Sequence, residues 1–313
     1  MSFSFAGYFK ISNLLSLLTL YIHHITWIIT DILAFSRSNT MFIICPPCAI
    51  GATQLLSGHM SIPDLFYSWI LSFIYLYFYI VQFNINNDIS GVEGDRIDKP
   101  ERPIPSNRVS IKRAWHLYYI TVMIYIVYSY SIGQLFPCLL WVFITIIHNF
   151  TTIQNTSIGK NSMMAPGIYA MVSVVWCLMN NVSNIYDHPK IVWNMVFNAC
   201  VIAAAAVQQD MRDVEGDRVQ GRRTFSVTMD NRKAGQLIIK ILFCVLLLIL
   251  IEASLVEQVR IVSKSTYMLI NCLLYGIMII RNLFSYDVRK TYEFYLQSTF
   301  FFYTFTMPII RTN

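Results

Sequence analysis

Long apolar segments separated by short polar stretches make up most of the sequence. A helix that crosses a bilayer needs about 20 mainly apolar residues. Segments of this kind lie at approximately 40–58, 64–87, 111–132, 134–150, 163–181, 190–209, 233–251, 265–283 and 290–309. The pattern predicts an all-α fold, a polytopic membrane helix bundle with about nine transmembrane helices.

The N-terminal part differs from these segments. Residues 12–36 are apolar and aromatic but carry polar side chains such as His23 and Asp31, which favours an interfacial or partly buried helix. We expect an N-terminal interfacial region over 1–39, without a cleavable signal peptide, and a transmembrane domain over 40–313. Ser110 follows Pro103 and Pro105 and is a plausible N-cap for the helix after it.

Composition agrees with a membrane protein and narrows its partners. The 313 residues are 56% hydrophobic and 13% charged, whereas soluble domains carry about 25% charged residues. The net charge of +6 includes no basic arm interleaved with aromatic residues, so we expect the lipid bilayer as a partner and no nucleic acid. Oligomeric state is left open.

The distribution of Lys and Arg predicts the orientation. If residues 40–58 begin in the cytoplasm, most of the 23 Lys and Arg residues fall on the cytoplasmic side, as the positive-inside rule requires. We therefore expect a multi-pass integral membrane protein whose active-site loops face the cytoplasm, in the endoplasmic reticulum if the protein is eukaryotic.

One pentapeptide occurs twice where apolar segments end. Val-Glu-Gly-Asp-Arg stands at 92–96 and again at 214–218. The same offset pairs Asp88 with Asp210 and Asp95 with Asp217, while Gly91 stands opposite Asp213. The two Asp-rich segments, 87–98 and 210–217, follow the second and sixth predicted spans, which places one at the end of each half of the bundle.

Clustered carboxylates need a compensating cation. Their oxygen ligands, with no Cys or His among them, favour Mg²⁺, which keeps several waters and also binds phosphate. Solvated loop charge is the alternative interpretation. Against it, nine of the 17 acidic residues fall within the two copies and their extension: Asp88, Glu93, Asp95, Asp98, Glu101, Asp210, Asp213, Glu215 and Asp217. We therefore expect Mg²⁺ ions that hold a diphosphate between the two segments.

The segment from Asn87 to Pro105 resembles the first motif, N-D-x-x-D-x-x-x-D with an R-P-I-P tail, of the UbiA superfamily of intramembrane prenyltransferases. Asp210-x-x-Asp213-x-x-x-Asp217 is similar to its second motif. The resemblance covers nearly the whole chain. It implies a UbiA-like bundle around a central cavity and an enzyme that ionises an isoprenoid diphosphate bound through Mg²⁺.

The resemblance also implies roles for individual residues. Asn87, Asp88 and Asp95 would bind one Mg²⁺, and Asp210, Asp213 and Asp217 the other. The five catalytic carboxylates are Asp88, Asp95, Asp210, Asp213 and Asp217. Lys160 resembles the family's diphosphate-contacting lysine, and the further substrate-binding candidates are Arg102, Arg222, Arg223 and Asn84. Asn84 lies one helical turn before Asn87, so we expect the two to share a face.

Gly91 departs from the family pattern, which has an Asp at this position. A small residue here is similar to the fungal branch of the family, which includes terpene cyclases. The sequence thus favours cyclisation of farnesyl or geranylgeranyl diphosphate in terpenoid biosynthesis. Prenyl transfer to an aromatic or other acceptor stays open, because both reactions need the same ionisation residues. A transporter is a third, remote alternative.

Overall fold

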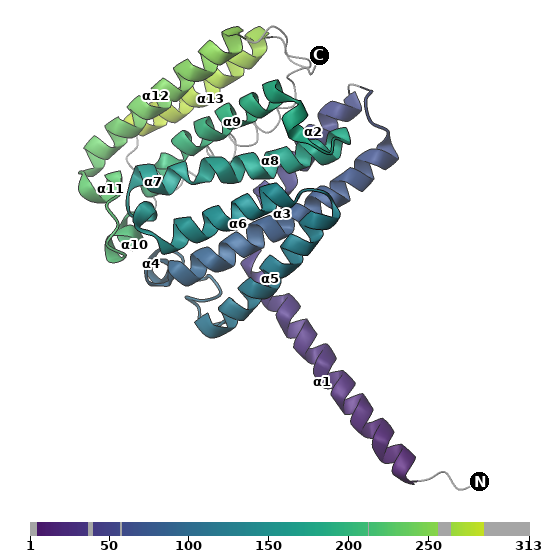
Figure 1. Cartoon of the computed structure of the whole chain (residues 1–313). Coiled ribbons are helices and arrows are strands. Elements are labelled where there is room, and N and C mark those ends of the chain that lie inside the picture. The colour runs from purple at the N-terminus through teal and green to yellow at the C-terminus, as the bar shows by residue number, and fades with distance from the viewer. Residues whose placement is uncertain (1–4, 37–39, 57, 212, 256–263, 285–313) are drawn as a thin grey trace.

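The chain folds into a bundle of helices, which a computed structural model describes for residues 5–36, 40–56, 58–211, 213–255 and 264–284 (Figure 1). No β-strand occurs in these ranges. The long helices are α1 (Phe5–Phe35), α2 (Met41–Leu56), α3 (Ile62–Ser90), α5 (Ile111–Ser131), α6 (Leu135–Phe150), α8 (Met164–Asn180), α9 (Pro189–Ala205), α12 (Asn231–Leu255) and α13 (Lys264–Phe284). The prediction of an all-α fold is confirmed.

Short helices join the long ones. They are α4 (Val92–Asp98), η1 (Thr152–Asn155), α7 (Ser157–Ser162), η2 (Ile185–Asp187), η3 (Ala206–Met211), α10 (Val214–Val219) and α11 (Phe225–Thr228). Figure 1 shows α4, α7, α10 and α11 at one end of the bundle. The two Asp-rich segments therefore lie at the same end.

The first eight predicted spans each coincide with a helix, and the ninth, 290–309, lies outside the described residues. Within the part of the chain that the structure describes, four helical stretches could cross a membrane by length and composition: Ile62–Ser90, Ser157–Asn180, Pro189–Met211 and Arg232–Ile251. Helices such as α2 and α6 have 16 residues each and are shorter than a full span. The number nine therefore stays a prediction.

Local sequence accounts for the boundaries of the helices that carry or follow the first Asp-rich segment. The Ser61 hydroxyl accepts a hydrogen bond from the Asp64 amide and caps α3. The Ser110 hydroxyl accepts from the Arg113 amide, so the predicted cap of α5 is confirmed. Between them α4 ends just before Pro100, which lacks the amide hydrogen needed to continue a helix.

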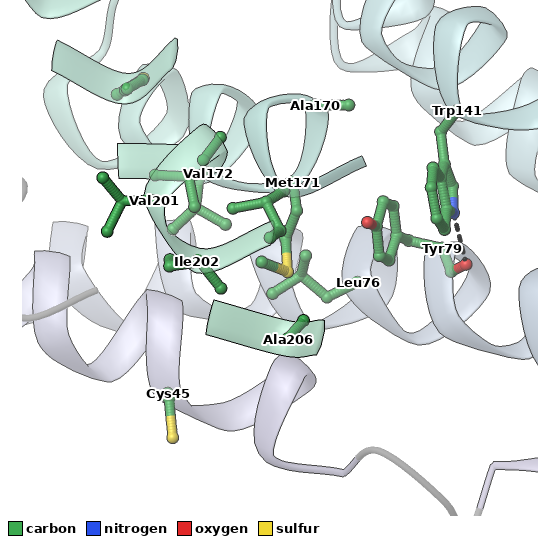
Figure 2. Packing of buried hydrophobic residues seen from close by; sticks show 14 of the residues in the cluster. Cys45, Leu76, Tyr79, Trp141, Ala170, Met171, Val172, Val201, Ile202 and Ala206 are labelled. Carbon is green, nitrogen blue, oxygen red and sulfur yellow. Dashed lines mark hydrogen bonds between the residues drawn. The ribbon is translucent and has the colours of Figure 1, made fainter. Parts of the chain in front are cut away.

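The core is centred on α8, which is buried on most of its surface. Figure 2 shows Met171 of α8 near Leu76 of α3, Ile202 of α9 and Ala206 of η3. A helix that is apolar on all sides is buried by its neighbours, and α8 packs against α2, α3, α6 and α9. This interior helix holds α3 and α9, and therefore the segments that follow them, in one bundle.

Helix α1 projects from the bundle, and only its C-terminal end packs against it (Figure 1). Asp31 is 3% exposed and pairs with Arg113 of α5, Nε to Oδ2 at 2.6 Å. The Asn84 amide of α3 donates to the Phe35 carbonyl at 2.8 Å. Upstream of Asp31, large apolar side chains such as Leu20 and Trp27 are exposed.

Candidate active site

The two Asp-rich segments meet where α4 packs against α10. Asp88 is in the last turn of α3, Asp95 is in α4, Asp210 is in η3, and Asp217 is in α10. Together with Asp213, these carboxylate residues are at most 8% exposed. A charge this deeply buried must be paired, and each one has a cationic partner.

Around the first copy, the cations are Arg102 and Lys99. Arg102 Nη1 lies 2.9 Å from Asp88 Oδ1 and 2.6 Å from Asp95 Oδ2. Burial lowers the pKa of the Arg102 guanidinium, but the neighbouring Asp88 and Asp95 carboxylates more than offset this and raise it above its ordinary value. The arginine is therefore charged at any physiological pH.

Around the second copy, the cations are Lys160 and Arg222. Lys160 Nζ lies 3.2 Å from Asp210 Oδ1 and 3.0 Å from Asp217 Oδ2. Arg222 Nη1 lies 2.8 Å from Asp217 Oδ1, and its Nη2 donates to the Gln154 side chain at 2.6 Å. The predicted lysine and one of the predicted arginines thus converge on the same carboxylate.

Lys99 joins the two copies. Its Nζ lies 3.4 Å from Asp95 Oδ1 and 3.2 Å from Asp213 Oδ1. Our sequence interpretation assigned this lysine no part in the site. Its position between Asp98 and Pro100 placed it within the first Asp-rich segment's extension. Nothing in the sequence, however, indicated that its amine lies between two carboxylates that are 118 residues apart.

The loops behind the second copy hold Lys160 in place. The Arg223 amide donates to the Asn155 carbonyl at 2.6 Å, and the Phe225 amide donates to the Ser157 hydroxyl at 2.8 Å. These bonds fix η1 and α7, which carries Lys160, against the segment after α10. The Lys160 amine is thereby held over Asp217.

The remaining candidates differ in burial and in partners. Asn87 is half-buried in the last turn of α3. Asn84 is buried, and its amide donates to the Phe35 carbonyl of α1. Arg223 is exposed. Glu93 and Glu215 also point outward, where they pair with Arg96 and Arg218 on the surface.

Gly91 is buried beside the first cluster. A Cβ added at this residue would lie 3.6 Å from Asp95 Oδ2 and 3.6 Å from Gln220 Nε2. A carboxylate at position 91 would therefore point toward the first cluster. Since Glu93 points to the surface, it does not fill this place.

Aromatic side chains of α3 and α6 pack against one another. Trp141 stacks on Tyr79 at 4.6 Å and on Phe83 at 5.2 Å between ring centroids. Phe83 in turn contacts His148, at 6.3 Å. The close approach of α8 to Trp141 depends on Gly167, because a Cβ there would overlap the indole ring. These rings form an aromatic cluster within the bundle, in which Tyr79 and Trp141 are buried.

Comparison with known proteins identifies relatives. Two proteins of Hericium erinaceus are similar to this chain: diterpene cyclase eriG, 29% identical over 56% of this chain, and polyprenyl transferase eriF, 30% identical over 56%. These alignments span 55% and 59% of the two relatives' own lengths, so this chain matches little more than half of each.

A solved structure shares the fold. It is a UbiA homolog from Archaeoglobus fulgidus bound to GPP and Mg²⁺, with a TM-score of 0.63 and 14% identity, over 88% of this chain and 99% of that one. Residues 44–305 match the UbiA prenyltransferase family. The chain therefore belongs to the UbiA prenyltransferase family of integral membrane enzymes.

Proposed function

We propose that this protein is a Mg²⁺-dependent terpene cyclase that ionises farnesyl or geranylgeranyl diphosphate within the membrane and cyclises the carbocation. The observation that carries the proposal is the cluster of five buried carboxylates with Lys99, Arg102, Lys160 and Arg222 where the two repeats meet. Such a cluster offers both metal ligands and phosphate-binding cations at one place.

The donor set fits Mg²⁺ bound together with a diphosphate. Among the described residues, no three His, Cys, Asp or Glu side chains converge closely enough to hold an ion by themselves. Mg²⁺ commonly uses one or two carboxylates, with waters and substrate phosphates as its other ligands. Two pairs meet this need: Asp88 and Asp95 share Arg102, and Asp210 and Asp217 share Lys160.

We assign one ion to the first copy and one to the second. Asn87, Asp88 and Asp95 would bind the first. Asp210 and Asp217 would bind the second, with Asp213 as its further predicted ligand through a bound water. When bound, Mg²⁺ stabilises the negative charge that develops on the departing diphosphate. Asn84, whose amide donates to α1, and Arg223, which is exposed, stay further substrate-binding candidates.

The cations of the chain bind the substrate. Lys160 acts as a point charge, and Arg102 and Arg222 bind phosphate oxygens as a planar fork. Each is held beside the carboxylates by ion pairs, so its positive charge would lie next to a diphosphate that binds there. These groups are held in place before reaction, which makes their electrostatic stabilisation effective.

The aromatic cluster of α3 and α6 would stabilise the carbocation. Tyr79, Phe83 and Trp141 stack on one another, and their π electrons would attract a nearby cation without offering a strong nucleophile. Tyr79 is 4% and Trp141 6% exposed, so water has little access. Longer survival of the cation favours attack by a double bond of its own chain.

Prenyl transfer to a separate acceptor is the second candidate. The similarity to polyprenyl transferase eriF supports it about as strongly as the similarity to diterpene cyclase eriG supports cyclisation. Gly91 favours cyclisation in our interpretation, because the first cluster departs here from the Asp of the transferase pattern. Both candidates share the ionisation step.

The test supplies the substrate without an acceptor. The purified chain in lipid nanodiscs is incubated with Mg²⁺ and either farnesyl or geranylgeranyl diphosphate, and products are analysed by gas chromatography and mass spectrometry. A cyclic hydrocarbon that disappears with EDTA supports the proposal. Turnover only after an aromatic acceptor is added would replace cyclisation with transfer. Absence of turnover under both conditions would contradict ionisation itself.

The orientation of the protein in the membrane and the role of its N-terminal part are also proposals. We propose that the Asp-rich segments face the cytoplasm, in the endoplasmic reticulum of a eukaryotic host, because diphosphate substrates and Mg²⁺ are found on that side. We also propose that residues 1–39 form an interfacial region next to the transmembrane domain of residues 40–313. The exposed apolar side chains of α1 support this division.

A further inference from the structure

Asp98 and Gln220 stand at equivalent positions of the two repeats, and each bonds to the backbone of the other repeat. Asp98 follows Asp95 by three positions, and Gln220 follows Asp217 by three. Asp98 Oδ2 accepts a hydrogen bond from the Gly216 amide of the second copy, at 2.9 Å. Gln220 Nε2 donates to the Gly91 carbonyl of the first copy, at 2.8 Å. Each repeat thus holds the backbone of the other.

The glycines of the two pentapeptides lie at this contact. A Cβ added to Gly94 would approach the Gly216 carbonyl oxygen to 2.9 Å and overlap Gln220 Nε2. A Cβ added to Gly216 would approach the Gly94 carbonyl oxygen to 3.0 Å and overlap Asp98 Oδ2. The glycines therefore let the two backbones touch and let the two crossing side chains reach their partners.

Both anchored backbone positions lie next to proposed ligands. Gly216 directly precedes Asp217. The Gly91 carbonyl also accepts from the Asp95 amide, at 2.9 Å. A shift of either anchor would therefore move a carboxylate of one cluster relative to the other cluster.

We infer that Asp98 and Gln220 are positioning residues that hold the two metal-binding clusters at the separation one diphosphate needs. The inference rests on the proposed function, because a single diphosphate must contact both clusters at once. Neither side chain contacts substrate in this scheme; both act through the backbone beside Asp217 and Asp95. Groups that orient metal ligands in this way typically contribute about 10- to 100-fold to metal affinity.

Binding of Mn²⁺ with inorganic pyrophosphate tests the inference without turnover. Free Mn²⁺ is followed by electron paramagnetic resonance as the purified chain is titrated. We expect Asp98→Ala and Gln220→Ala to bind the Mn²⁺ pyrophosphate complex roughly tenfold more weakly than the unchanged protein. Asp98→Asn should stay within about twofold of it, because the amide oxygen still accepts the Gly216 bond.

Matched controls come from the same pentapeptides. Glu93→Ala and Glu215→Ala remove exposed carboxylates and should leave binding unchanged. If Asp98→Ala does not fold, Gln220→Ala decides alone, since its side chain is only half-buried.

Unchanged binding in Gln220→Ala, or an equal loss in Asp98→Ala and Asp98→Asn, would overturn the inference and leave the proposed function standing. Failure of the unchanged protein to bind Mn²⁺ with pyrophosphate would instead overturn both.

Discussion

Asp88 and Asp217 differ in burial from Glu215. Both are at most 3% exposed and bound to arginine, whereas Glu215 is on the surface. We expect Asp88→Asn and Asp217→Asn each to lower turnover by about 100-fold or more, because each removes a charge from a preorganised site. Product formation per folded protein measures this, with Glu215→Gln as the control. Retained activity in either Asp variant would remove that residue from the site.

Gly91→Asp restores the carboxylate that the first cluster lacks. Since a Cβ at 91 lies 3.6 Å from Asp95 Oδ2, the new charge should bind Mg²⁺ and lower the concentration for half-maximal turnover by roughly tenfold. The same Cβ lies 2.9 Å from the Asn87 carbonyl oxygen, so a small local shift is needed. Gly91→Ala has this shift without the charge and is the matched control. Equal Mg²⁺ requirements in the two variants would show that the missing carboxylate has no effect on Mg²⁺ binding.

Lys160 neutralises two carboxylates that have almost no access to water. Its side chain is 12% exposed, and those of Asp210 and Asp217 are 1% and 2%. Lys160→Met leaves this buried pair without its shared cation, which should destabilise the fold by about 3 to 5 kcal/mol. Thermal unfolding measures the loss, and added Mg²⁺ should restore part of it by replacing the positive charge. Lys160→Arg is the control with charge retained. A Met variant as stable as the Arg variant would contradict this pairing.

At the scale of elements, the contact between α4 and α10 depends on two glycines. Gly94→Ala and Gly216→Ala each place a methyl group against backbone, which should destabilise the protein by about 1 to 3 kcal/mol. Gly276→Ala in α13 meets nothing within 4 Å and should be neutral or slightly stabilising, because alanine favours a helix. Unfolding in denaturant compares the three variants. Equal stability of all three would mean that the two short helices do not pack this closely.

Helix boundaries near the site were predictable, but the contacts of the helices were not. Ser110 and the prolines of 100–105 act on their own backbone neighbours, so sequence alone locates the start of α5 and the end of α4. The Asn84 side chain shows the opposite case. Its spacing from Asn87 suggested a shared face, yet it bonds to Phe35 of α1, a helix whose approach no local pattern reveals.

At the scale of the whole molecule, the packing of α4 on α10 puts both Asp-rich segments at one end of the bundle, and we propose that this end faces the cytoplasm. Glu93 and Glu215 are exposed there. In a cysteine-free background, Glu93→Cys and Glu215→Cys should therefore react equally with a membrane-impermeant maleimide, and only when the reagent reaches the cytoplasmic face. Labelling in sealed vesicles of both orientations measures this. Labelling of the two sites from opposite faces would contradict the fold, and labelling of both from the other face would reverse the proposed orientation.

The sequence by itself determined the class of the protein and the segments that carry its chemistry. Apolar length predicts helices that cross a membrane, and a repeated Val-Glu-Gly-Asp-Arg marks two acidic segments, because both signals lie in consecutive residues. Only the tertiary structure decided how those segments meet. Lys99 bridges Asp95 and Asp213, Lys160 lies over Asp217, and Asp98 binds the Gly216 amide. Most of these contacts join residues far apart in the chain, so packing of the whole bundle determines them.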